Sequence, residues 1–165
     1  MVSQKTIEIV KATAPIIREK GEEITRRMYE ITFAERPDYK RGFETTWMQH
    51  LDGGEQAHKL AAAVYAYATH IDRLDELAMA VKTIAHRHVQ TRTLPEQYPL
   101  IGEKLLQAMK DVLQDAATDE VISAWAEAYT ALADIFIQKE KAIYQQEDRE
   151  LTEQLAKANK PETSG

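Results

Sequence analysis

The 165-residue sequence contains no cysteine, only five prolines and only six glycines. The absence of cysteine excludes disulfides, thiolate metal ligands and a cysteine nucleophile, and it fits a reducing compartment. Few helix-breaking residues, together with plentiful Ala, Glu, Lys, Leu and Gln, favour helices. Because no strand pattern competes with the helical periodicity, we expect an all-α domain of about six to eight helices.

The sequence also lacks an excess of positive charge and a long apolar run. A net charge of −6 argues against a general nucleic-acid surface. The first residues, MVSQKTIEIVKATAP, are interrupted by charges and do not resemble a signal peptide. No apolar stretch approaches the roughly 18 residues that a membrane span needs. These absences predict a soluble, cytoplasmic protein without nucleic-acid or membrane partners, and they leave its oligomeric state open.

Breaking residues divide the N-terminal part of the chain. We expect a first helix that begins at the N-cap Ser3 and ends near Gly21, with Pro15 either kinking it or starting its last part. A second helix is expected from there to about Ala34.

The rest of the chain continues in the same way after an irregular connector over 37–54. Thr118 is expected to be the N-cap of the last helix. Further helices are predicted over about 55–74, 75–89, 95–114 and 119–146. Residues 1–146 are therefore one predicted domain, and the polar residues 147–165 are a tail that is either a helix extension or disordered.

Two histidines in the stretch TIAHRHVQ, His86 and His88, raise the question of a metal site. On a helix these two side chains point to nearly opposite sides. His88 falls on the apolar stripe of its helix, whereas His86 shares a face with Lys82 and Gln90. His88 is thus the inward histidine, either a core residue satisfied by hydrogen bonds or a metal ligand.

Two other polar residues favour a site. Tyr98 follows Pro95 at the start of a predicted helix, and Glu140 lies on the apolar seam of the last helix, four residues after Phe136. A carboxylate on such a seam needs a partner, because burying it unpaired is unfavourable. The alternative for Glu140 is a helix-end charge that reaches water. An inward His, Tyr and Glu together are typical of a network that orients a ligating imidazole.

Other metal arrangements do not match. The stretch EQAH, from Glu55 to His58, has the Glu-x-x-His spacing of di-iron bundles, but these need two copies and two further glutamates. The sequence has no His-Glu-x-x-His motif and no cluster suited to structural zinc. A single protein ligand, His88, suggests haem, in which the porphyrin supplies four further ligands to iron.

Over about residues 3–146, the chain resembles the bacterial single-domain haemoglobins and the globin domain of flavohaemoglobins, including the thermoglobin type. Five segments carry the resemblance, in order and at the right separations: TIEIVKATAPIIREKG, MYEITFAERPDYKRGF, AVKTIAHRHVQ, PEQYPLIGEKLLQAMKDVL and DAATDEVISAWAEAYTALADIFIQKE. The resemblance implies a globin fold around a haem pocket, with haem b (iron protoporphyrin IX) as the cofactor.

On the proximal side, the resemblance makes His88 the iron ligand. It assigns Tyr98 and Glu140 to the hydrogen-bonded network behind that ligand. Lys59 falls where globins often place a cation near a haem propionate, and Arg87 is a second basic residue suited to a propionate.

On the distal side, the resemblance assigns four residues. Tyr29 matches the tyrosine whose hydroxyl points at bound ligand, and Phe43 matches the phenylalanine that packs on the porphyrin. Gln56 matches the distal glutamine, and Leu60 the apolar residue over the ligand. Without the resemblance, the alternatives are an ordinary boundary tyrosine for Tyr29, a loop anchor for Phe43 and a solvated lysine for Lys59.

The distal connector departs from the family pattern. The stretch ETTWMQHLDGG is a few residues longer than the family implies, so other side chains compete with Gln56 for the distal pocket: Trp47, Met48, Gln49 and His50. Gln49 or His50 could even reach the iron. The sixth iron ligand therefore stays open between these two residues, Gln56, Tyr29 and water.

The resemblance implies reversible binding of O2, NO and CO, with O2 held tightly by distal hydrogen bonds. With a separate reductase, such a site could oxidise NO with O2 to nitrate. A separate reductase is expected because only a polar tail follows Tyr144 and the sequence contains no Gly-rich dinucleotide fingerprint. The alternatives are non-enzymatic O2 storage or delivery, a haem-based gas sensor and a haem-free helical bundle, so enzymatic activity is left open.

Overall fold

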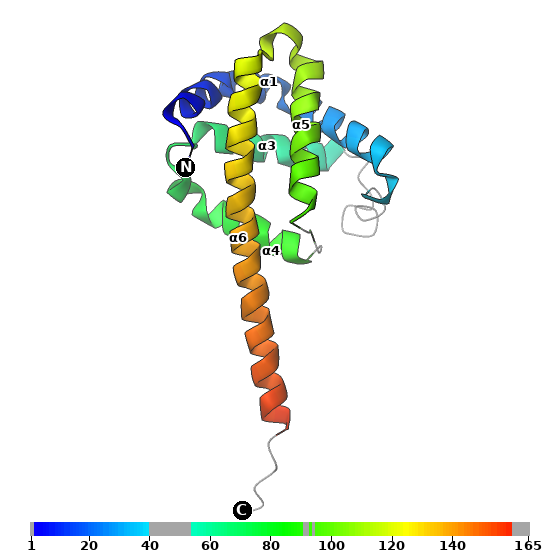
Figure 1. The fold of residues 1–165 in the computed structure, drawn as a ribbon, viewed down its shortest axis with the longest axis vertical. Helices are drawn as coiled ribbons and strands as arrows, with labels where there is room; N and C mark the ends of the chain where they lie inside the picture. The colour runs from blue at the N-terminus through cyan, green and yellow to red at the C-terminus, as the bar shows by residue number, and fades with distance from the viewer. Residues whose placement is uncertain (1, 40–53, 91–92, 94, 160–165) are drawn as a thin grey trace, which may run out of the picture.

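The computed structural model describes residues 2–39, 54–90, 93 and 95–159 of the chain. Within these ranges the long elements are all helices, and no strand occurs (Figure 1). In chain order they are α1 (Gln4–Glu35), α3 (Gly54–Thr69), the 3-10 helix η1 (Leu74–Leu77), α4 (Ala78–Gln90), α5 (Gln97–Leu113), the 3-10 helix η2 (Gln114–Ala116) and α6 (Asp119–Ala158). The predicted all-α class is confirmed.

The N-terminal helix α1 is continuous, and the predicted boundary at Gly21 is wrong. Gly21 is buried where α1 meets α3, and a Cβ atom on it would lie 3.4 Å from the Cβ of Ala61. The glycine therefore lies at a contact between two helices and not at the end of a helix. Pro15 lies inside α1, where its missing N–H removes one bond of the helical ladder without ending the helix.

Both predicted N-caps are confirmed. The Ser3 hydroxyl accepts from the Thr6 N–H at 3.2 Å, and the Thr118 hydroxyl accepts from the Val121 N–H at 3.2 Å. In addition, the Glu127 carboxylate on α6 accepts from the backbone N–H of Ser3 at 2.8 Å and from the Thr6 hydroxyl at 2.6 Å. The first turn of α1 is thus tied to the third turn of α6.

The helices pack around two apolar clusters. Tyr129 and Leu132 of α6 each contact both clusters. The larger cluster joins α1, α3, α5 and the first half of α6, while the smaller one joins α4, the start of α5 and the middle of α6. In Figure 1, α5 and α6 run side by side and α1 and α3 cross them. Among the described residues, α3 and α4 do not pack on each other as extensively as the other neighbouring helices do. We call the helices around the larger cluster one layer and the helices around the smaller cluster the other layer.

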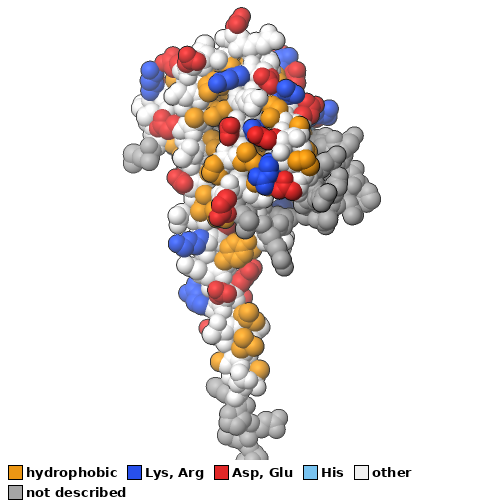
Figure 2. Space-filling view, turned by 45° about the vertical axis from the view of Figure 1, so that its right-hand side comes forward, with side chains coloured by type: hydrophobic (Ala, Val, Ile, Leu, Met, Phe, Trp, Pro, Cys, Tyr) orange, Lys and Arg blue, Asp and Glu red, His pale blue; other side chains and the backbone are white. Residues whose placement is uncertain are grey.

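The last helix, α6, runs past its predicted end near residue 146 to Ala158. Its final turns extend beyond the other helices and expose three large apolar side chains, those of Tyr144, Leu151 and Leu155 (Figure 2). The division into a domain over 1–146 and a tail over 147–165 stays a prediction. None of the helices described here combines the length and the apolar character needed to cross a membrane.

Candidate functional site

Three helices bring His88, Tyr98 and Glu140 together. His88 lies in the last turn of α4, Tyr98 in the first turn of α5, and Glu140 in the part of α6 beside them. The α4–α5 connection is short and hydrogen-bonded at both ends: the Thr93 N–H donates to the His88 carbonyl at 2.9 Å, and the Tyr98 N–H to the Pro95 carbonyl at 3.3 Å. The Tyr98 hydroxyl thereby lies within hydrogen-bonding distance of His88 at the end of α4.

The three side chains share one compact hydrogen-bond network. His88 Nδ1 lies 2.7 Å from Glu140 Oε1 and 2.9 Å from the Tyr98 hydroxyl oxygen. The Tyr98 hydroxyl donates to the same Oε1 at 2.6 Å. The carboxylate oxygen therefore accepts from both partners, and the predicted His–Tyr–Glu network is present as geometry.

This arrangement determines where the imidazole proton lies. A carboxylate can only accept, and the single hydroxyl proton of Tyr98 already points to Glu140. The proton between His88 and Glu140 must then come from Nδ1. An imidazole that donates from Nδ1 offers its other nitrogen, Nε2, to a metal, and a carboxylate behind it makes that nitrogen a better ligand.

The three members of the network differ in how far they are buried. Glu140 is 4% exposed and Tyr98 is 9% exposed, whereas the His88 side chain is 31% exposed. Burial, reinforced by the hydrogen bond to Glu140, raises the pKa of the Tyr98 hydroxyl far above its ordinary value. Tyr98 is therefore a permanent donor at any physiological pH, and it holds the carboxylate in place beneath the imidazole.

Two residues that sequence reasoning did not single out support Tyr98. The Tyr129 hydroxyl on α6 donates to the Tyr98 backbone carbonyl at 2.6 Å. The Tyr129 ring occupies the space beside Gly102, where a Cβ atom would lie 2.3 Å from a ring carbon. A glycine inside a helix costs about 1 kcal/mol relative to alanine, so Gly102 was a visible signal of a packing constraint.

Phe136 of α6 supplies an apolar wall for the imidazole. Its ring centroid lies 5.5 Å from that of His88, with the planes tilted by 55°. Phe136 is buried within the smaller apolar cluster, together with Ala85, Tyr98 and Ala133. The imidazole is thus held by polar contacts at one nitrogen and by an aromatic ring at its side.

The donor set fits a cofactor that needs one protein ligand. Within the described part of the chain, no group of three or more His, Asp or Glu side chains is arranged to hold a metal ion. His88 has the proton on the side away from Nε2, a partly exposed ring, and apolar neighbours. These features fit an axial haem ligand.

Two of the predicted distal residues, Tyr29 and Leu60, belong to the larger apolar cluster. Tyr29 of α1 is buried in the larger cluster and stacks on Phe33, with centroids 5.6 Å apart and planes at 28°. Leu60 of α3 is half-buried against the same cluster. Gln56 lies in the first turn of α3, but its side chain lies outside the described part of the structure. Phe43 also lies outside the described residues.

The remaining predicted contacts are exposed or outside the described residues. Lys59 of α3 and Arg87 of α4 are both exposed. His86 is exposed, as the helical pattern predicted. The alternatives for the distal pocket lie outside the described residues: Trp47, Met48, Gln49 and His50.

Comparisons with known proteins identify the family of the chain. The chain is 45% identical over 151 residues to a flavohemoprotein of Oceanobacillus iheyensis, covering 92% of this chain and 36% of that relative. It is 47% identical over 146 residues to an uncharacterized globin-like protein of Aquifex aeolicus, covering 88% of this chain and 99% of that protein. The chain thus spans about a third of the flavohemoprotein and nearly all of the globin-like protein.

A solved structure shows the same fold. The flavohemoglobin of Malassezia yamatoensis, with bound FAD and heme, superposes with a TM-score of 0.79 at 28% identity, over 88% of this chain and 38% of that chain. The Globin family model matches residues 26–136, a range that contains Tyr29, His88 and Tyr98. The chain belongs to the globin family.

Proposed function

We propose that this globin binds haem b with His88 as the protein ligand, and that it binds O2, NO and CO reversibly. Membership of the globin family and the heme in the Malassezia structure support a haem cofactor. The observation that carries the proposal is the contact of His88 Nδ1 with Glu140 at 2.7 Å, which leaves Nε2 as the metal-binding nitrogen. When bound, the haem iron supplies a coordination position for a diatomic ligand.

On the proximal side, the chain's own residues hold a proton. Glu140 and Tyr98 keep the His88 proton on Nδ1 and give the imidazole partial imidazolate character, which strengthens it as an electron donor. Phe136 and the surrounding apolar side chains keep water from competing for these hydrogen bonds.

On the distal side, we assign hydrogen-bond donation to Tyr29 and Gln56. Both come from the layer opposite His88, on α1 and α3, and the Tyr29 side chain is already buried there. A hydroxyl and an amide can donate to a ligand that carries partial negative charge. We also assign the apolar cover over the ligand to Leu60 and the contact with the porphyrin to Phe43.

Two exposed cations complete the assignment. Lys59 and Arg87 are suited to the haem propionates. The sixth position in the ferric state is taken by water, Tyr29, Gln56, Gln49 or His50, and the ferric absorption spectrum distinguishes an internal ligand from water.

For activity, we favour oxidation of NO by O2 to nitrate, with electrons from a separate reductase. The similarity to a flavohemoprotein of which this chain spans 36% supports this reading. The second candidate is non-enzymatic O2 storage or delivery. It is favoured by the similarity to the Aquifex protein, which this chain covers over 99% of its length. A gas-sensor role is a third and weaker reading, through the free end of α6.

The first test is ultraviolet–visible absorption of the purified protein in the ferric, reduced and reduced-plus-CO states. We expect an intense haem band that shifts with CO, and its loss or alteration in His88→Ala. His86→Ala is the matched control, because His86 is an exposed histidine on the same helix. A protein that takes up no haem after reconstitution, or a His88→Ala spectrum identical to wild type, would overturn the proposal.

A second test separates the two activities. Haem-loaded protein is supplied with NO, O2, NADH and a flavin-dependent reductase, and nitrate is measured. Stoichiometric nitrate formation over many turnovers supports the dioxygenase reading. Reversible oxygenation without sustained nitrate formation supports storage or delivery.

A further inference from the structure

Small residues lie at the contact of α1 and α3. Gly21 and Thr25 lie one turn apart on α1, and Ala57 and Ala61 lie one turn apart on α3. The Cβ of Ala61 lies 3.4 Å from the position that a Cβ on Gly21 would take. Thr25 is 1% exposed and Ala57 is 0% exposed, so the contact is fully shielded from water.

The Thr25 hydroxyl bridges the two helices. It donates to the Ala57 carbonyl at 2.7 Å, and it also lies 3.1 Å from the Glu22 carbonyl of its own helix. A hydroxyl has one proton, and the shorter contact takes it. The Ala57 carbonyl has two lone pairs, so it can accept this bond in addition to its bond within α3. Thr25 is therefore a polar anchor between α1 and the first turn of α3.

On each helix, this anchor is close in sequence to one of the two proposed distal donors. Ala57 directly follows Gln56 in α3, and Tyr29 lies one turn after Thr25 on the same face of α1. We infer that Thr25 is a positioning residue, which fixes the backbone of Gln56 relative to Tyr29 through its hydrogen bond to Ala57 and thereby sets how strongly the distal side donates to a diatomic ligand. This inference rests on the proposed function.

The structure provides a matched control for the inference. Thr32 is a second threonine of α1, 0% exposed, whose hydroxyl donates to the Met28 carbonyl at 2.7 Å. Its bond stays within α1, whereas the Thr25 bond crosses to α3. Replacing either threonine by valine keeps the shape and removes one buried hydroxyl bond. Only the Thr25 substitution removes a hydrogen bond between α1 and α3.

The experiment compares Thr25→Val, Thr25→Ser and Thr32→Val in the haem-loaded, reduced protein. Three quantities are measured: the infrared C–O stretch of the CO complex, the O2 dissociation rate, and amide hydrogen exchange over α3. We expect Thr25→Val to shift the C–O stretch towards weaker distal donation and to speed O2 release about five-fold. It should also speed exchange in the first turns of α3.

Thr25→Ser, which keeps the hydroxyl, should restore wild-type values, and Thr32→Val should leave all three near wild type. Equal effects of the two valine variants, or no rescue by serine, would overturn the inference. Tyr29→Phe is measured in parallel. If Tyr29→Phe speeds O2 release and Thr25→Val does not, the inference fails while the proposed function stands. If Tyr29→Phe has no effect, the proposed distal hydrogen bond fails as well.

Discussion

The two sides of the proposed haem pocket are held by different kinds of contact. Where α4, α5 and α6 meet, three polar side chains lie within 2.6–2.9 Å of one another, and proton positions decide the geometry. Where α1 and α3 meet, small and larger apolar side chains make the buried contact, and the Thr25 hydroxyl donates across it to the Ala57 carbonyl. At its exposed edge, His58 Nδ1 lies 3.4 Å from Glu22 Oε2. The first side should therefore respond to loss of polarity, and the second to changes of size or to loss of the buried Thr25 bond.

The largest effect is expected from Glu140→Leu, which replaces the shared acceptor by an apolar side chain of similar size. The buried Tyr98 hydroxyl loses its acceptor and can donate to His88 instead, which favours the tautomer that cannot ligate iron. We expect the free energy of unfolding to fall by about 3 kcal/mol and the iron–histidine stretch to weaken. Denaturant titration and resonance Raman spectroscopy measure the two.

Glu147→Leu is the control for that substitution, since Glu147 is an exposed carboxylate on the same helix. It should change the free energy of unfolding by less than about 0.5 kcal/mol. Equal losses in the two variants would show that the Glu140 network adds nothing specific.

A smaller loss is expected from Gly102→Ala. The added methyl group would lie 2.3 Å from the Tyr129 ring, which must then move and strain its hydrogen bond to Tyr98. We expect a loss of about 1–3 kcal/mol, measured by thermal or denaturant unfolding. A Gly102→Ala, Tyr129→Ala double variant should show a strongly non-additive effect, because the second change removes the obstacle. Simple additivity would disprove the proposed clash.

The same substitution in the other layer should have the opposite sign. At Gly21 an added methyl group would make ordinary contacts with Ala61 and Ile17, at 3.4 and 3.5 Å. Alanine is the better helix former, so Gly21→Ala should raise the free energy of unfolding by about 0.5–1 kcal/mol. A destabilised Gly21→Ala protein would show that the α1–α3 contact cannot accommodate an added methyl group.

The smallest effect is expected from Glu127→Gln, which changes the polar contact between α6 and the start of α1. Hydrogen bonds from the Thr6 hydroxyl and then from the Ser3 backbone lower the pKa of Glu127 below its ordinary value. A carboxyl whose pKa is lower in the folded state stabilises the fold at pH above its unfolded pKa, and this stabilisation disappears as pH falls through the folded pKa. Wild type should therefore exceed Glu127→Gln in stability at pH 7, and the difference should shrink on acidification below pH 4.5. A difference that is constant with pH would exclude this origin.

The residues of the polar network could be predicted from the sequence better than the residues of the α1–α3 contact. His88 could be recognised because it lies on an apolar helical stripe, and Glu140 because a carboxylate four residues after Phe136 needs a partner. Neither inference needs long-range distances. The mutual contact of the two with Tyr98 depends on how α4, α5 and α6 pack, and there the family resemblance carried the prediction.

The α1–α3 contact has a weaker signal in the sequence. Gly21 was interpreted as a helix boundary, because glycine breaks helices more often than it admits a neighbour. Thr25 is one of several threonines, and nothing local distinguishes a hydroxyl that crosses to another helix from one that bonds within its own, like that of Thr32. Tyr129 was missed as a support of Tyr98 because its acceptor is a backbone carbonyl, which has no sequence signature.

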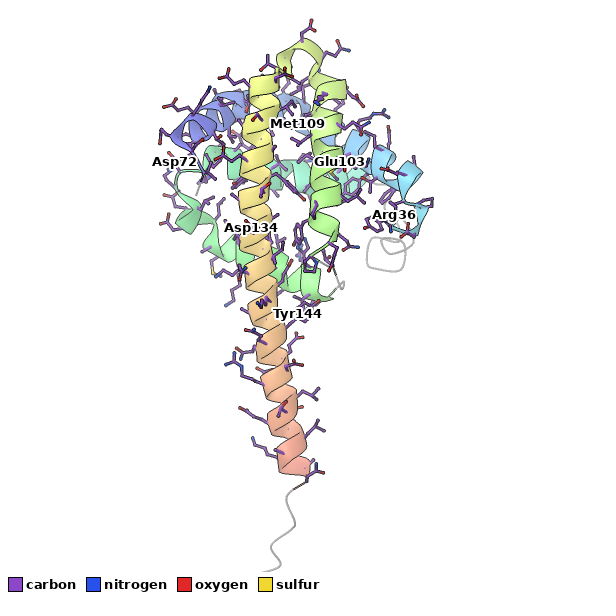
Figure 3. All side chains as sticks on the ribbon, viewed as in Figure 1. Arg36, Asp72, Glu103, Met109, Asp134 and Tyr144 are labelled. Carbon is purple, nitrogen blue, oxygen red and sulfur yellow. The ribbon has the colours of Figure 1, made fainter. Side chains whose placement is uncertain are left out.

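The length of α6 has a consequence for how the molecule tumbles. Its 40 residues span about 60 Å, whereas a compact domain of this chain length is only about 40 Å across. Figure 3 shows Asp134 on α6 among the other helices and Tyr144 farther along towards its free end. Rotational diffusion should therefore be anisotropic, with α6 close to the long axis. Backbone N–H bonds lie parallel to a helix axis, so the amides of α6 should show a longer apparent correlation time in 15N relaxation than those of α1 and α3, which cross it.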